Sequence, residues 1–215
     1  MPIVYAPIEH LPVVFEDDAV LLVNKPSGML SQPGKYEDGS ALTRVISSDR
    51  ELHGPILVHR LDMDTSGLLL MAKSRDVHRN LQQQFEKRQI QKRYRAVVKK
   101  AVSGIGGVIQ LPIRLDVDNR PRQIVCHEHG KPSITFWRRT HSHDAHGITL
   151  YPVTGRTHQL RVHAAALNGL GSAIVGDRLY GESEPTQRLM LHADFLSFLH
   201  PVSNQRQRVF CPAPF

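Results

Sequence analysis

Short apolar runs of strand length, separated by polar turns, dominate this sequence and constrain its fold more than any other feature. Residues 13–16 and 19–24 flank an Asp-Asp pair, which predicts a hairpin. Residues 133–138, 148–153 and 189–199 predict further strands. Strands that follow one another in blocks, with few helices between them, favour an α+β fold with a mixed or antiparallel sheet and a few flanking helices.

Three segments predict helices, namely residues 41–50, 75–89 and 157–168. The second has an apolar residue at every fourth position among charged and amide residues, which indicates an amphipathic helix with a basic outer face. The third is expected to begin near Thr154 or Thr157 and to end at Gly169. The apolar stripes of these two helices are Val77, Leu81 and Phe85, and Leu160, Ala164 and Leu167.

Length and composition fit one ordinary globular domain. The 215 residues, 40% of them hydrophobic, predict a single domain over residues 1–215 with residues 1–12 as an N-terminal extension. No apolar run approaches the roughly 20 residues that span a bilayer, and residues 1–18 turn acidic where a secretory signal needs a basic start. We therefore expect a cytoplasmic protein, in which Cys126 and Cys211 are packing residues.

Positive charge is concentrated in one segment. The chain carries a formal net charge of +7, whereas residues 73–100 alone hold ten basic and two acidic residues and therefore carry +8. The first 24 residues hold four acidic residues and neither Lys nor Arg. Such polarity predicts a polyanionic partner. The candidate binding residues within the basic segment are Lys87, Arg88, Lys92 and Arg93.

The segment most suggestive of chemistry is residues 57–67, which place an arginine and two carboxylates in a tight turn. Apolar runs at residues 56–59 and 67–72, both predicted as strands, enclose this turn. A carboxylate held there is rigid and partly desolvated. Aspartate is also an ordinary turn residue, so composition alone does not choose between Asp62 and Asp64.

The order His59-Arg60-Leu61-Asp62, followed by Thr65-Ser66-Gly67, resembles the signature of the RluA-type pseudouridine synthases. Other segments resemble the same family in the expected order along the whole chain. These are residues 24–28 (NKPSG), 92–96 (KRYRA), 155–163 (GRTHQLRVH) and 191–193 (LHA). The compact length and residues 118–123 and 130–132 resemble the members that modify both rRNA and tRNA.

The resemblance implies roles for individual side chains. Asp62 is expected to act at C1′ of the target uridine, and Arg161 to keep that carboxylate ionised. Tyr94 is expected to stack on the base and to assist removal of the C5 proton. Arg60 is expected to fill the space that an everted uridine leaves, and Leu191 to form the apolar floor under the uracil.

The implied reaction breaks the N1–C1′ bond of uridine and rejoins the base through C5. Because this isomerisation involves no redox change, we expect neither a cofactor nor a metal. Many members of the family add an S4-type RNA-binding domain, which we do not expect here, so the catalytic domain itself must bind RNA. The expected substrates are a stem-loop of large-subunit rRNA and a tRNA anticodon stem-loop. We expect a monomer with no membrane and no obligate protein partner.

Two other functions compete with this interpretation. A zinc-dependent hydrolase would use the histidines of residues 141–146, but Ala145 stands where such a motif needs aspartate, and Asp144 comes one place too early. The three histidines are His141, His143 and His146. A non-catalytic RNA-binding module would need only the basic segment. This alternative does not explain why Asp62, Tyr94 and Arg161 occur together.

Overall fold

The structure is a computed structural model that describes residues 11–34, 39–48, 50–141, 144–181 and 188–215. These residues divide into two compact units. The middle unit comprises Arg93–Leu191 and Phe215, and the split unit comprises residues 11–92 together with His192–Pro214. None of the described helices has both the length and the apolar character that a membrane crossing requires.

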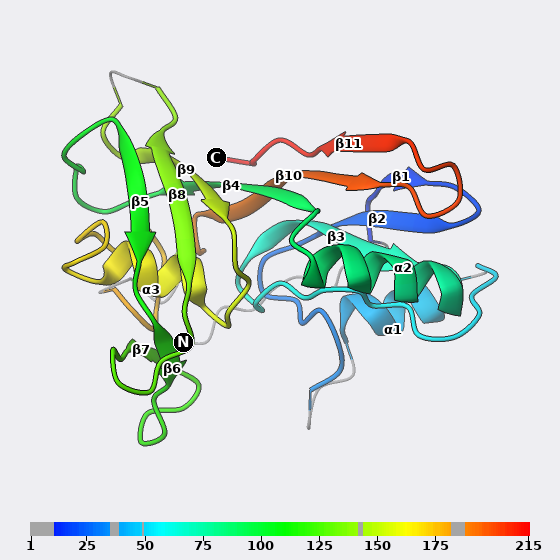
Figure 1. Ribbon diagram of the computed structural model, residues 1–215, viewed down its shortest axis with the longest axis horizontal. Helices are drawn as coiled ribbons and strands as arrows, with labels where there is room; N and C mark the ends of the chain where they lie inside the picture. The colour runs from blue at the N-terminus through cyan, green and yellow to red at the C-terminus, as the bar shows by residue number, and fades with distance from the viewer. Residues whose placement is uncertain (1–10, 35–38, 49, 142–143, 182–187) are drawn as a thin grey trace. The chain divides into compact units, whose positions relative to one another are not determined.

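The sheet of the split unit is mixed, as the sequence predicts. Its strand order is β1-β2-β3-β10-β11, in which β3 and β10 run parallel and the other neighbours antiparallel (Figure 1). The predicted hairpin is confirmed. Asp17 stabilises its turn, because its Oδ1 accepts hydrogen bonds from the backbone of Ala19 and Val20 at 2.9 and 2.8 Å. The strands are β1 (Val13–Glu16), β2 (Val20–Lys25), β3 (Ser66–Ala72), β10 (Leu191–Leu199) and β11 (Arg206–Phe210).

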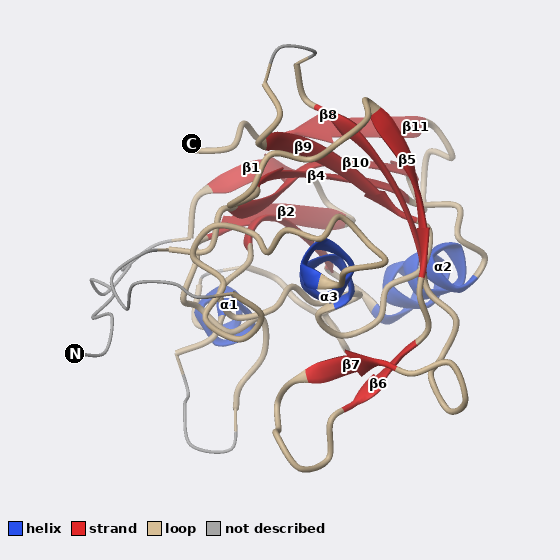
Figure 2. Ribbon diagram, turned by 90° about the vertical axis from the view of Figure 1, so that its left-hand side faces the viewer, coloured by secondary structure: helices blue, strands red, loops and turns tan. Residues whose placement is uncertain are grey.

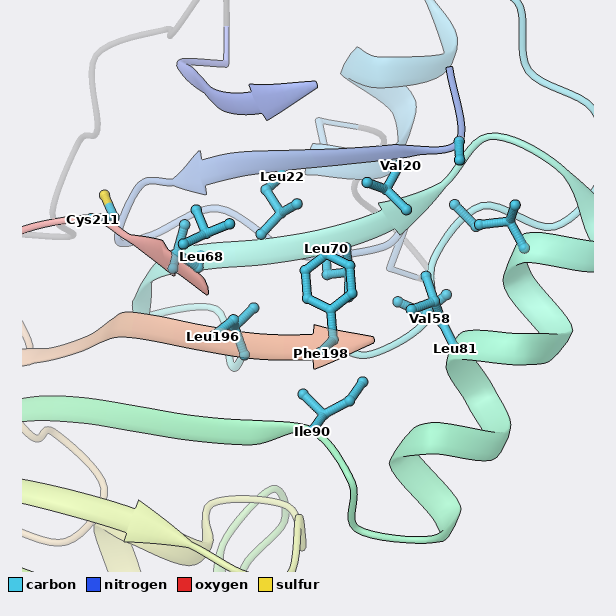
Figure 3. Close-up of a cluster of buried hydrophobic side chains, with 14 residues drawn as sticks. Val20, Leu22, Val58, Leu68, Leu70, Leu81, Ile90, Leu196, Phe198 and Cys211 are labelled. Atoms are coloured by element: carbon cyan, nitrogen blue, oxygen red, sulfur yellow. The ribbon is translucent and has the colours of Figure 1, made fainter. Parts of the chain in front are cut away.

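The core of the split unit lies between this sheet and α2 (Arg75–Glu86). All seven residues of β3 are buried, which explains its uninterrupted apolar sequence. Helix α2 begins at the N-cap Ser74 and presents Val77 and Leu81 to the sheet, as predicted. Figure 3 shows the side chains that meet there from the strands and the helix, among them Leu22, Leu68, Leu70, Leu81, Leu196 and Phe198.

Two local predictions in this unit are wrong. Residues 56–59 form a loop that pairs with β3 only through the single bridge of Leu57 to Met71 and a 2.8 Å hydrogen bond from Ala72 N to Ile56 O. Side chains of α2 bind the next two carbonyl groups: His78 Nε2 donates to Leu57 O at 3.1 Å and Gln82 Nε2 to Val58 O at 2.7 Å. The predicted helices end early, at Ile46 in α1 (Ala41–Ile46) and at Glu86 in α2. Beyond Glu86, Arg88 has a φ of 56° and turns the chain out of the helix.

The middle unit contains an antiparallel sheet and a separate two-stranded ribbon. The sheet has the order β4-β9-β8-β5, and β6 pairs with β7 to form the ribbon (Figure 2). The strands predicted near residues 133–138 and 148–153 are therefore confirmed with small shifts. The elements are β4 (Gln91–Val97), β5 (Gly106–Gln110), β6 (Ile113–Leu115), β7 (Gln123–Val125), β8 (Ile134–Arg139) and β9 (Gly147–Pro152).

Helix α3 (Gln159–Ala165) is buried around almost its whole circumference. The helix ends at Ala165 and is shorter than predicted. Leu167, which was expected in its apolar stripe, lies beyond this end and is 92% exposed. Neither threonine caps it: the N-cap is His158, with a φ of 54°, while Thr154 Oγ1 donates to Gln159 Oε1 at 2.8 Å. Polar residues inside a buried helix need partners, and α3 finds them in neighbouring strands and loops.

Candidate active site

Asp62 lies in the turn that connects the 56–59 loop to β3. Leu61 before it is buried, whereas Asp62, Met63 and Asp64 are half-buried. The turn closes on itself through a 3.1 Å hydrogen bond from Thr65 N to Asp62 O. The carboxylate is therefore carried by ordered backbone and is still reachable from solvent.

Residues 27–31 hold this turn from the outside. Ser31 Oγ donates to Leu61 O at 2.8 Å and accepts from Leu61 N at 2.9 Å. Ser27 Oγ donates to Asp64 O at 2.6 Å, and the backbone N–H of Gly28 donates to Met63 O at 2.9 Å. Backbone groups on both sides of Asp62 are thus fixed by hydrogen bonds, which restricts where its carboxylate can lie.

Lys25, at the end of β2, anchors the same turn. Its side chain is fully buried, and Nζ donates to the carbonyl oxygens of Pro26, Met29 and Met63 at 2.8, 2.7 and 3.0 Å. Burial lowers the pKa of Lys25 to about 7, although the carboxylates of Asp62 and Asp64 favour its charged form. The sequence indicates Lys25 only through its place in the motif of residues 24–28, which assigns it no role.

The two residues at the start of the catalytic signature differ in their environments. His59 Nε2 accepts a 2.9 Å hydrogen bond from Leu70 N, and its ring lies 5.0 Å from that of Phe85. Burial, together with the charge of Lys92, lowers the pKa of His59 to about 3, so the imidazole is neutral and structural. Arg60, the predicted space-filling residue, is exposed.

Beyond the turn, β3 and β10 approach each other closely. Gly67 has a φ of 112°, and a Cβ there would collide with the backbone of Ala193. Ser66 Oγ donates to His192 Nδ1 at 2.9 Å, and His192 Nε2 donates to Cys211 O at 3.1 Å. The serine and glycine of the signature and the histidine of the 191–193 motif therefore join two strands of one sheet.

Arg161 lies on α3, and its side chain is bound by Asp177. Nε and Nη2 donate to the two carboxylate oxygens at 2.9 and 2.7 Å, and both side chains are buried. Asp177 Oδ1 also accepts from the backbone of Leu179 and Tyr180 at 3.0 and 3.1 Å. This bidentate arrangement fixes the plane of the guanidinium. Asp177 was not predicted as a site residue, because it lies outside the family motifs of the sequence.

Tyr180 connects Arg161 to the β6–β7 ribbon. The Arg161 guanidinium lies 5.3 Å from the centre of the Tyr180 ring, within cation–π distance. The hydroxyl of Tyr180 accepts a 2.7 Å hydrogen bond from Gln123 N of β7 and donates to His158 Nδ1 at 2.7 Å. One side chain thus contacts the ribbon, the start of α3 and the arginine.

Tyr94 and Leu191 belong to one hydrophobic cluster of the middle unit. Leu191 is buried, and the half-buried Tyr94 packs against the cluster, which also contains Leu160 of α3. The structure therefore brings together the two residues predicted to contact the base. Arg161 lies on the helix that contributes to this cluster.

The predicted RNA-binding residues do not form one helical face. Lys87 and Arg88 are exposed in the turn after α2, whereas Lys92 and Arg93 are half-buried on β4. Burial lowers the pKa of Lys92 to about 8. The 75–89 segment was expected to be a helix with a basic outer face. The helix ends at Glu86, so Lys87 and Arg88 lie beyond it and do not contribute to such a face.

The structure gives the zinc-hydrolase alternative no support. Within the described ranges, no three or more His, Cys, Asp or Glu residues are grouped so that they could hold a metal ion. His143, one of the three proposed ligands, lies outside the described residues. Cys126 and Cys211 are free thiols.

The predicted site residues are distributed over both units. Arg60, Asp62, Lys87, Arg88 and Lys92 belong to the split unit, and Arg93, Tyr94, Arg161 and Leu191 belong to the middle unit. The pairing of Asp62 with Arg161 stays a prediction.

Comparison with known proteins points to one family. The family profile described as RNA pseudouridylate synthase matches residues 19–166. A Vibrio vulnificus protein named dual-specificity RNA pseudouridine synthase RluA is 43% identical, over 98% of this chain and 89% of its own length. The Escherichia coli K12 protein of the same name is 40% identical, over 95% of this chain and 94% of its own length.

A solved structure agrees with these sequence relatives. The human protein named RNA pseudouridylate synthase domain containing 1 has a TM-score of 0.78 and 29% sequence identity, and the match covers 96% of this chain and 85% of that one. The fold is thus shared along almost the whole chain.

Proposed function

The chain belongs to the RNA pseudouridylate synthase family and is an isomerase acting on RNA uridines, and from this premise we propose that Asp62 is its catalytic carboxylate. The observation that carries the proposal is the anchoring of the Asp62 turn. Lys25, Ser27 and Ser31 fix backbone groups on both sides of a carboxylate that is only half-buried. A group that must meet C1′ of a substrate benefits from such preorganisation.

The reaction is balanced within the uridine itself. The bond from N1 to C1′ breaks, a bond from C5 to C1′ forms, the C5 proton leaves, and N1 gains a proton. Asp62 either attacks C1′ or assists removal of a proton from the sugar. In the proposal, Arg161 favours the ionised form of Asp62, and Asp177 keeps the guanidinium oriented for that role.

The other site residues act on the base and on the RNA duplex. Tyr94 stacks on the uracil and assists removal of the C5 proton, while Leu191 forms the apolar floor beneath it. Their common hydrophobic cluster supports this assignment. Arg60 fills the space that the everted uridine leaves. Its side chain is exposed, as this role requires.

We propose two kinds of structured RNA as substrates, a stem-loop of large-subunit rRNA and a tRNA anticodon stem-loop. The relatives named as dual-specificity enzymes, which match this chain over nearly its full length, support more than one substrate. The proposed enzyme acts in the cytoplasm as a monomer, and it works without a cofactor because the isomerisation involves no redox change.

The test replaces each carboxylate of the turn separately. Asp62→Asn is expected to abolish pseudouridine formation in both stem-loops, measured by carbodiimide modification and primer extension. The matched control Asp64→Asn removes the same charge two residues away and is expected to retain activity. Circular dichroism checks the fold of both variants. Pseudouridine formed by Asp62→Asn at the wild-type rate would refute the assignment, and loss of activity only in Asp64→Asn would transfer the role to that residue.

A further inference from the structure

A pocket of about 630 Å³ opens beside the β6–β7 ribbon of the middle unit. We call it the ribbon pocket. Its walls come from β6 and the start of β7, from the turn at residues 129–131, and from residues 155–157 ahead of α3. None of the proposed catalytic or base-binding residues lines it. The lining residues are Ile113, Arg114, Leu115, Pro121, Gln123, His129, Lys131, Gly155, Arg156 and Thr157.

The charge of the ribbon pocket is positive and uncompensated. Arg114, Lys131 and Arg156 line it, and no carboxylate does. Within the described part of the chain, none of these three cations forms an ion pair. Arg114 Nη1 and Arg156 Nε donate to the backbone carbonyl oxygens of Leu115 and Pro132 at 3.0 and 3.3 Å, and the Arg114 side chain also hydrogen-bonds the Cys126 thiol. Three cations around one hollow, drawn from three different segments, favour an anionic ligand.

The volume and the apolar lining of the ribbon pocket favour a ligand that is larger than a single inorganic anion. The volume lies within the range of about 300–1,000 Å³ that is typical of organic ligands and exceeds what a single phosphate fills. Ile113, Leu115 and Pro121 supply apolar surface in the same hollow, and Leu115 and Pro121 are exposed. An apolar wall facing cations matches the two halves of a nucleotide, its base and its phosphate.

The ribbon pocket is also connected to Arg161. Gln123 lines the pocket, and its backbone N–H donates to the Tyr180 hydroxyl. The Tyr180 ring lies against the Arg161 guanidinium. A ligand bound beside Gln123 is therefore linked to Arg161, a proposed catalytic residue, through the side chain of Tyr180.

We propose that the ribbon pocket holds one phosphate-bearing nucleotide of the RNA substrate, distinct from the uridine that is isomerised. The phosphate binds Arg114, Lys131 and Arg156, and the base lies against Leu115 and Pro121. This inference rests on the proposed action on structured RNA. It adds a binding site within the middle unit, outside the basic segment that the sequence indicated.

The charge part is tested with the double variant Lys131→Gln/Arg156→Gln, which changes two exposed side chains. Binding of a fluorescein-labelled anticodon stem-loop is measured by fluorescence anisotropy over a range of salt concentrations. Loss of one phosphate contact is expected to weaken binding about tenfold at low salt and to lower the slope of log K against log salt by about 0.7 to 0.9. The matched control Arg206→Gln/Arg208→Gln removes two exposed charges from β11 and is expected to leave affinity and slope unchanged.

The base part is tested with Leu115→Ala, which is expected to weaken binding several-fold at an unchanged slope. The free mononucleotide UMP, titrated as a second probe, is expected to bind far more weakly than the stem-loop. If the Lys131/Arg156 variant binds RNA like the β11 control, or if UMP binds as tightly as the stem-loop, the inference is overturned.

Pseudouridine formation by the wild-type chain is measured in parallel. Its absence would count against the proposed function, whereas an unchanged salt slope in a chain that forms pseudouridine would count against the ribbon pocket alone.

Discussion

The buried Lys25 predicts an unusual dependence of stability on pH. In the unfolded chain its pKa takes the ordinary value of 10.5, whereas burial lowers the pKa to about 7 in the folded chain. Below pH 7 both states hold the proton, and the folded state bears the full cost of burying the charge. Above about pH 10.5 neither state holds it. Between these values the unfolded chain binds more protons, so stability rises with pH.

The magnitude follows from the two pKa values. Their difference corresponds to about 5 kcal/mol in total, at about 1.4 kcal/mol for each pH unit. About 2 kcal/mol of this is regained between pH 7 and pH 9. The variant Lys25→Met lacks the titrating group and therefore lacks this contribution, while other groups titrate alike in both proteins.

The measurement is urea unfolding of the wild type and of Lys25→Met at several pH values between 7 and 10. The unfolding free energy of the wild type minus that of the variant is expected to increase by about 2 kcal/mol from pH 7 to pH 9. Lost hydrogen bonds shift this difference at every pH, so only its slope is used. A difference that stays constant with pH would refute the reasoning, because the ammonium would then be as well stabilised inside the fold as in water.

Three further substitutions test the supports of the site. Gly67→Ala is expected to lower the unfolding free energy by about 3 kcal/mol or more, because the new Cβ meets the Ala193 backbone at a positive φ; a small change in the urea midpoint would contradict this. Ser31→Ala removes both hydrogen bonds to Leu61, so we expect a loss of about 1–3 kcal/mol and a lower kcat at nearly unchanged KM in a pseudouridine assay, whereas an unaltered kcat would argue against backbone anchoring. Tyr180→Phe removes two hydrogen bonds and is expected to lower the melting temperature by several degrees, corresponding to about 1–3 kcal/mol; an unchanged melting temperature would show that the hydroxyl adds nothing.

Periodicity predicted the regular elements where burial follows the backbone period. The four-residue spacing of Val77 and Leu81 is of this kind, whereas β3 was recognised as a short continuous apolar run because the whole strand is buried. The sequence pattern failed at residues 56–59, because that segment makes a single bridge to β3 and two of its carbonyl groups bind side chains of α2, which only tertiary structure brings near. It failed again at Leu167, where the chain leaves α3 too early for the stripe to continue.

The site was predictable to the extent that its residues lie in motifs. The family resemblance singled out Asp62, Tyr94 and Arg161, but it did not reveal the residues that hold them. Lys25 and Asp177 are charged, and charged residues are normally expected at the surface. Their burial depends on carbonyl oxygens and on a guanidinium that come from other parts of the fold.

The parallel pairing of β3 with β10 affects how this protein is made on the ribosome. Ser66 and His192 lie 126 residues apart, so the nascent chain exposes β3 long before its neighbour has been synthesised. All seven residues of β3 are buried in the finished fold, and an uncovered strand of this composition readily joins other chains. Strand β3, which follows the turn of Asp62, can pair with β2 as soon as it is made, but its other edge stays open to aggregation until β10 is synthesised.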